Sequence, residues 1–293
     1  MNIQTTIDQL YPLLQGEKGD NQLEFLEGLP EPTRDAILTY TGSGNRQIGF
    51  VCLVGSVNYE INDDLSDVDL KATFIPTLKD LYRNSFPTFE VTSPQFDLTM
   101  ATVHHFKSYM LKGNINFFEP LWAKHIAINP NLERFWDMMR LLVEMNISQT
   151  VRSTYGTIRQ KEKRLNKAVE GSPILDGKGA ATIVRLFHFL ETLVTTGEFN
   201  IIPDEPTKKL IYSLRHDEIS YDEFIPYYKN LDTQIGLRYL FEPHTFMMEG
   251  SYKHLSATVM ELDQSDTPEY KELNEIADQA LLDVIEEGIL QCL

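Results

Sequence analysis

Short apolar runs separated by turn residues dominate the first 130 residues or so, whereas helical periodicity dominates the remainder. Apolar runs that end at Gly, Pro or polar clusters are typical of strands. Strands are predicted over 47–54, 67–75 and 89–100, the last interrupted at Ser93-Pro94. In the same part of the chain, helices are predicted over 3–14, 31–40, 77–83, 104–111 and 117–126.

Beyond Asn129-Pro130-Asn131 the pattern is almost wholly helical, and Gly and Pro residues punctuate it. The chain is therefore predicted to be α+β, with an N-terminal domain over 1–130 and an all-helical domain over 131–293. In the second domain, helices are expected over 131–145, 148–170, 178–196, 205–215, 221–241 and 268–290.

The composition is that of an ordinary globular protein, with 42% hydrophobic and 24% charged residues among 293. The formal net charge of −17 disfavours a non-specific binder of polyanions, although a local basic groove is compatible with it. Two cysteines, Cys52 and Cys292, make no disulfide framework, so a reducing, cytoplasmic setting is expected. The N-terminus lacks the features of a signal peptide, and no apolar run is long enough to span a membrane.

The most informative stretch begins with the apolar run Phe50 to Val54, which ends at Gly55-Ser56. Asp67 and Asp69 follow, two residues apart, so on a strand both carboxylates point to one face. Like charges this close repel unless a cation lies between them, and magnesium suits carboxylates combined with phosphate oxygens.

Two interpretations of this stretch compete. Gly55 permits close backbone approach, and Ser56 offers a hydroxyl and an N–H to an anion. Alternatively, Gly-Ser makes an ordinary turn and the acids face solvent, which is the commoner origin of an isolated Asp-x-Asp pair. The apolar neighbours Val68 and Leu70, together with the preceding strand, favour the functional interpretation.

Asp97 lies between Phe96 and Leu98 on a predicted strand. It would complete a carboxylate trio that shares metal and accepts the proton of an attacking hydroxyl. An edge-strand aspartate in water explains the residue equally well.

Lys178 and Arg185 lie seven residues apart on one predicted helix, and therefore on one stripe. Two such cations suit a triphosphate, whose charge must be countered as pyrophosphate leaves. A solvated helix face is the commoner explanation, but the apolar neighbours indicate a buried helix whose cations need partners.

Two further stretches carry weaker signals. Lys112 to Glu119 is best explained as a capped helix end, with Asn116 and Glu119 as candidates to line a cleft. The basic residues between Arg159 and Lys167 indicate an exposed helix face first and a groove for nucleic-acid phosphates second.

Gly55-Ser56 followed by Asp67-Val68-Asp69 resembles the signature of the DNA polymerase beta nucleotidyltransferase superfamily. Within it, the chain most resembles the predicted nucleotidyltransferases associated with RNA-repair operons. That resemblance also includes Lys112-Gly113-Asn114 with Glu119, and Lys178 with Arg185, and it spans roughly residues 50–200.

The resemblance implies a palm-like mixed sheet, two Mg²⁺ ions, with Mn²⁺ as a substitute, and a nucleoside triphosphate such as ATP. Asp67, Asp69 and Asp97 would be the catalytic and metal-binding residues, and Gly55 and Ser56 would hold the terminal phosphates. The helical domain would close the nucleotide cleft.

We therefore expect a magnesium-dependent nucleotidyltransferase that moves a nucleoside monophosphate to an acceptor hydroxyl and releases pyrophosphate. The family context suggests an RNA 3′ end as acceptor, and a tRNA is a further candidate. The net charge of −17 favours a protein, a small molecule or a partner that brings its own basic surface. The alternatives are a toxin or antiphage transferase that modifies tRNA or protein, and a degenerate nucleotide-binding regulatory module. The three carboxylates disfavour the last.

Overall fold

A computed structural model describes residues 31–41, 46–63, 66–86, 88–92, 96–169, 175–235, 259 and 261–291. The predicted helix over 3–14 and Cys292 lie outside these ranges. Contacts between residues divide the chain into two compact units. The first comprises Met1–Leu111, Asn116–Val143 and Thr267–Leu293, and the second comprises Lys112–Ile115 and Glu144–Asp266.

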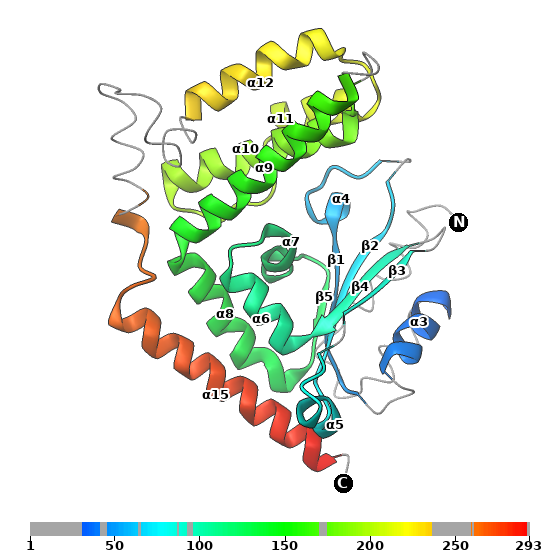
Figure 1. The fold of residues 1–293 in the computed structure, drawn as a ribbon, viewed down its shortest axis with the longest axis vertical. Coiled ribbons are helices and arrows are strands. Elements are labelled where there is room, and N and C mark those ends of the chain that lie inside the picture. Colours follow the sequence, from blue (N-terminus) through cyan, green and yellow to red (C-terminus); the bar gives the residue numbers. More distant parts are fainter. Residues whose placement is uncertain are drawn as a thin grey trace. The chain divides into compact units, whose positions relative to one another are not determined.

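The first unit contains a five-stranded sheet in the order β3-β4-β2-β1-β5 (Figure 1). β2 and β4 run parallel, and the remaining neighbours are antiparallel, so the sheet is mixed. The prediction of an α+β fold is confirmed. The strands are β1 (Ile48–Val54), β2 (Asp69–Phe74), β3 (Phe89–Thr92), β4 (Asp97–Thr102) and β5 (Ile126–Ile128).

Helices cover the two faces of the sheet (Figure 1). On one face, Ile37 of α3 (Glu31–Thr41) joins a core built from alternate residues of β1, β2 and β4. On the other, Phe50 packs edge-on against Phe106 of α6 (Val103–Leu111) at 5.0 Å and Trp136 of α8 (Glu133–Met145) at 4.7 Å between ring centroids. Apolar side chains from both faces of β1 are thus removed from water.

The edge strand β5 departs from the sequence prediction of a helix over 117–126. The chain forms α7 (Ile115–Phe118) and the 3-10 turn η1 (Glu119–Trp122), and then extends to pair with β1. The backbone N–H of Leu53 donates to the carbonyl of His125 at 2.9 Å. This segment forms a strand because it pairs with β1, which is distant in sequence. Local periodicity does not encode such pairing.

The second unit consists of α9 (Ile147–Val169), α10 (Gly177–Thr196), α11 (Glu205–Arg215) and α12 (Tyr221–Ile235). These helices confirm the predicted ones, apart from 236–241, which lie outside the described ranges. Asp176 caps the start of α10 by accepting from the N–H of Gly179 at 2.9 Å. Gly197 ends it in the left-handed conformation, with φ of 75°.

Two helices beyond residue 130 belong wholly or mostly to the first unit. α8 contributes Trp136 to the sheet, and α15 (Pro268–Gln291) places Asp278 in an ion pair with Lys107 of α6. The contacts thus follow a different division from the single expected boundary at residue 130. Among the described residues, none of the helices is both long and apolar enough to cross a membrane.

A partly buried ion pair joins the residues just before β1 to α5 (Leu78–Tyr82). Arg46 donates to both oxygens of Asp80, with Nε to Oδ2 at 2.9 Å and Nη2 to Oδ1 at 2.7 Å. Asp80 and Thr77 also form a capping box at the start of α5. Burial alone would raise the pKa of Asp80, but the hydrogen bonds from Arg46 and Thr77 outweigh it and lower the pKa to about 2.

We predict that the Asp80 pair stabilises the fold above pH 4 and that this contribution disappears as the pH falls toward 2. The folded-state pKa lies below the ordinary value of 3.8, so the folded protein releases this proton more readily than the unfolded chain. The contribution is about 2 kcal/mol at neutral pH. Urea unfolding from pH 7 to pH 2.5 measures it.

In that experiment, Asp80→Asn should lower stability at pH 7 and flatten its dependence on pH. The matched control is Asp137→Asn, which alters an exposed residue of α8 and should leave the profile unchanged. If Asp80→Asn leaves the pH dependence of stability as it is in the wild type, that dependence does not come from Asp80.

Candidate functional site

Asp69 and Asp97 lie side by side in the sheet. They are register partners at the first positions of the parallel strands β2 and β4, so both side chains project from the same face. Both are half-buried. The N–H of Asp97 donates to the carbonyl of Val68 at 2.8 Å, which extends the pairing beyond the start of β2. From the sequence, this placement was one of two equally good explanations of Asp97, because local periodicity does not determine which strands pair.

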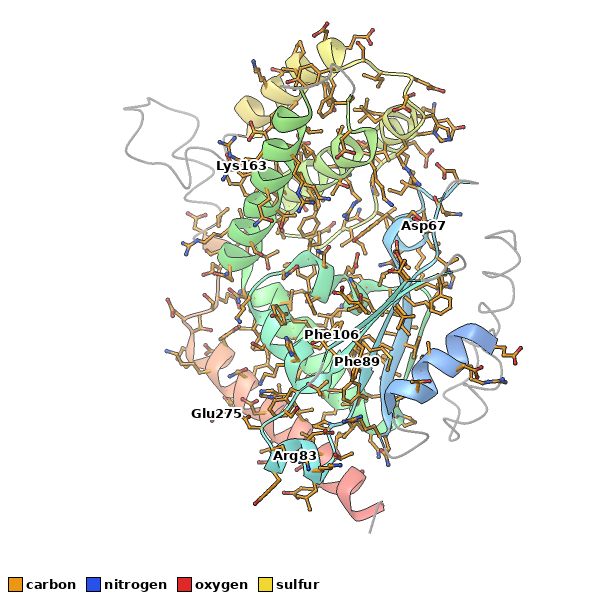
Figure 2. The ribbon with its side chains drawn as sticks, turned by 45° about the vertical axis from the view of Figure 1, so that its right-hand side comes forward. Asp67, Arg83, Phe89, Phe106, Lys163 and Glu275 are labelled. Atoms are coloured by element: carbon orange, nitrogen blue, oxygen red, sulfur yellow. The ribbon has the colours of Figure 1, made fainter. Side chains whose placement is uncertain are left out.

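Asp67 precedes β2 on the extended segment that contains Val68, and its side chain is exposed. Figure 2 shows Asp67 at one end of the sheet, with Arg83 at the opposite end. Asp67 and Asp69 flank Val68, whose side chain is buried in the core of the other face. The expected strand over 67–75 begins only at Asp69, but the extended backbone keeps the two-residue spacing of the carboxylates.

Gly55 lies against the carboxylate of Asp69. β1 ends at Val54, the register partner of Asp69, and the chain then turns into the short helix α4 (Gly55–Asn58). Gly55 has φ of +65°, and a Cβ added there would overlap Asp69 Oδ2. Both the backbone conformation and the lack of space require glycine at this position. Ser56 follows directly and is half-buried.

The donor set suits a hard cation. Carboxylate oxygens are the ligands that Mg²⁺ prefers, and the absence of a side chain at Gly55 makes room for the Asp69 carboxylate. In the part of the chain that the structure describes, no three His, Cys, Asp or Glu side chains are already gathered as a metal-binding group. Strand register brings Asp69 and Asp97 together, and Asp67 lies two residues before Asp69 on the extended segment that leads into β2.

Glu119, expected at a cleft, is instead buried beneath the site with 3% of its surface exposed. Its Oε1 accepts from Nζ of Lys71, and its Oε2 accepts from the hydroxyl of Tyr59. Nζ of Lys71 also donates to the backbone carbonyl of Asn116, whose own side chain is exposed. The network joins β2, the end of α4 and the α7–η1 segment.

Sequence reasoning did not single out Lys71 or Tyr59. The available signal was a lysine inside the apolar strand 70–74, because a buried ammonium group requires a partner. Cys52 is the cross-strand partner of Lys71 and is fully buried. Burial raises the pKa of the Cys52 thiol far above its usual range, although the charge of Lys71 opposes this. The thiol is therefore protonated at neutral pH, which excludes it as a nucleophile.

Lys178 and Arg185 belong to the second unit, where both lie on α10. Lys178 is exposed in the first turn of the helix, whereas Arg185 is buried with 9% of its surface exposed. Their spacing of seven residues keeps them on one stripe, but the stripe passes from solvent into the core. Their role at a triphosphate stays a prediction.

Some of the basic residues of α9 form ion pairs within the helix, and others are exposed to solvent. Arg159 forms an ion pair with Glu162, one turn away. Lys163, labelled in Figure 2, and Arg164 are exposed.

We predict that Glu119→Ala destabilises the first unit by about 3–5 kcal/mol, because it leaves the Lys71 ammonium buried without its carboxylate. Lys71→Met combined with Glu119→Gln should recover most of this loss, because it removes both charges and keeps an acceptor for Tyr59. Urea unfolding at pH 7 measures the free energy of unfolding of each variant. The control Glu275→Ala, at an exposed position of α15, should change it by no more than about 0.5 kcal/mol. A double variant as unstable as Glu119→Ala would contradict this account.

The chain matches no protein-family model, and a search of curated proteins also finds no match for it.

Proposed function

We propose that the protein is a magnesium-dependent nucleotidyltransferase that transfers a nucleoside monophosphate from a nucleoside triphosphate to an acceptor hydroxyl. One observation carries the proposal: Asp69 and Asp97 are register partners on adjacent strands, and Gly55 is packed against Asp69. A sheet that needs only to be stable gains nothing from two half-buried carboxylates side by side, because like charges repel. The resemblance of Gly55-Ser56 and Asp67-Val68-Asp69 to the nucleotidyltransferase signature supports the same chemistry.

In the proposed mechanism, Asp67, Asp69 and Asp97 hold the metal, and Gly55 and Ser56 bind the terminal phosphates. Mg²⁺ bound there would supply charge neutralisation for the triphosphate and make the acceptor hydroxyl more acidic. Asp97 would accept the proton of that hydroxyl. The acceptor oxygen forms a bond to the α-phosphorus while the bond from that phosphorus to the bridging oxygen breaks, and pyrophosphate leaves with the electron pair. Lys178 and Arg185 are proposed to counter the charge of the triphosphate.

Pyrophosphate release tests this function. Each nucleoside triphosphate, carrying a label on the α-phosphate, is incubated with magnesium and with total RNA, purified tRNA or a protein mixture. We expect release of pyrophosphate and transfer of label to one acceptor class, both abolished by EDTA. Asp69→Asn and Asp97→Asn should each lower kcat by at least about 100-fold, because charge stabilisation in the site is lost. Asp137→Asn serves as the control at a distant exposed position.

The outcomes separate the alternatives. Full activity in the Asp67→Asn, Asp69→Asn double variant would refute the site. Tight nucleotide binding without pyrophosphate release from any acceptor would favour the regulatory module. Label confined to tRNA or protein, with growth arrest on expression that Asp69→Asn relieves, would favour the toxin or antiphage transferase.

We further predict that Gly55→Ala lowers kcat/KM for the triphosphate by at least about tenfold. The added Cβ is strained at positive φ and displaces the Asp69 carboxylate, each of which costs about 1 kcal/mol or more. Steady-state kinetics measure the effect. Gly156→Ala on α9 is the matched control, because a Cβ added at Gly156 meets nothing within 4 Å. If both variants retain wild-type kinetics, the turn at Gly55 does not bind the phosphates.

A further inference from the structure

The α4 turn is attached to β2 at both of its ends. At the first end, Gly55 packs against the carboxylate of Asp69. At the other, Tyr59 follows α4 and its N–H closes the turn on the carbonyl of Gly55 at 3.2 Å. The hydroxyl of Tyr59 binds one oxygen of Glu119, and Lys71 of β2 binds the other. Glu119 therefore links the end of the turn to the strand that carries Asp69.

The distance along the α4 turn from residue 55 to residue 59 is similar to the distance along β2 from residue 69 to residue 71. Residues 55 and 59 are four apart, which corresponds to about 6 Å along a helical turn. Residues 69 and 71 are two apart on the same face of a strand, which corresponds to about 6.7 Å. Gly55 thus approaches β2 directly, whereas Tyr59 is connected to β2 through Glu119. The turn is therefore held at two points.

Burial makes the second attachment difficult to break. Tyr59, Lys71 and Glu119 expose 4%, 9% and 3% of their surfaces. Glu119 therefore supplies, in place of water, an acceptor for the Tyr59 hydroxyl and an acceptor for the Lys71 ammonium group. The segment that precedes β5 also supports the turn, because Oδ1 of the buried Asn58 accepts from the N–H of Lys124 at 3.3 Å. The position of Gly55-Ser56 relative to Asp69 is therefore set by a polar network outside the carboxylates themselves.

We propose that Tyr59, Lys71 and Glu119 are positioning residues that set the distance between the phosphate-binding turn and the metal-binding aspartates. This inference rests on the proposed function. The terminal phosphates would be held by Gly55-Ser56 and the α-phosphate would face Asp69, so a shift of the turn misaligns the bond that breaks. Displacements of about 1 Å are enough to lower a rate by up to about 100-fold.

Tyr59→Phe tests the inference, because it removes one buried hydroxyl and keeps the ring. We expect kcat to fall by about tenfold while KM for the triphosphate changes by less than threefold, since the phosphate-binding groups remain present. Hydrogen exchange at the amides of residues 55–60 should accelerate by about tenfold, with exchange in β4 unchanged. Tyr82→Phe makes the same chemical change at a tyrosine of α5 that is 90% exposed, and should alter neither measurement.

Two results would overturn the inference. Unchanged exchange at residues 55–60 in Tyr59→Phe would show that the network does not hold the turn, whatever the activity. Faster exchange with unchanged kcat would show that the held position does not matter for catalysis. A wild-type protein that releases no pyrophosphate would refute the proposed function, and with it the catalytic part of the inference, while the exchange result still decides whether the network holds the turn.

Discussion

The parallel pairing of β2 with β4 is the constraint on which the candidate site depends. It places the first residue of each strand at the same end of the sheet, and those residues are Asp69 and Asp97. Had β4 been antiparallel to β2, Asp97 would lie beside the far end of β2, about 17 Å from Asp69. The connection through α5 and β3 makes the parallel arrangement possible, because it returns the chain to the starting end before β4 begins. The capping box at Asp80 therefore serves the site indirectly, since it fixes the start of that connection.

The sheet face that carries the aspartates changes character along its length. Toward the end of β2, Phe50 packs under the aromatic residues of α6 and α8, as in an ordinary core. Toward the start, the same face carries Asp69, Lys71 and Asp97. Buried charge lowers stability unless it is fully partnered, and Lys71 is partnered through Glu119. Such a network beside two half-buried carboxylates lowers the stability of the fold, and packing alone does not explain why these residues are present.

The sequence predicted the parts of this arrangement that local pattern encodes. The apolar run before Gly55, the spacing of Asp67 and Asp69 and most of the helices follow from periodicity and turn chemistry, and the structure has them at nearly the expected positions. The strand β5 and the placement of α15 depend on partners far away in sequence. For the same reason Glu119 was expected at a cleft: its burial follows from Lys71 and Tyr59, which are 48 and 60 residues away from it.

If the protein is the proposed transferase, local charge would contribute to the choice of its acceptor. A long nucleic acid binds mainly through the neutralisation of several phosphates, and each contact requires an available Lys or Arg. The net charge of −17 opposes the approach of a polyanion at long range. In the described part of the densest basic run, Arg159 is already paired with Glu162, while Lys163 and Arg164 remain exposed to solvent. For the proposed transferase, two neighbouring exposed cations on α9 would suit a short or structured RNA end better than an extended strand. The acidic balance would favour, more strongly still, an acceptor that is neutral or carries positive charge of its own.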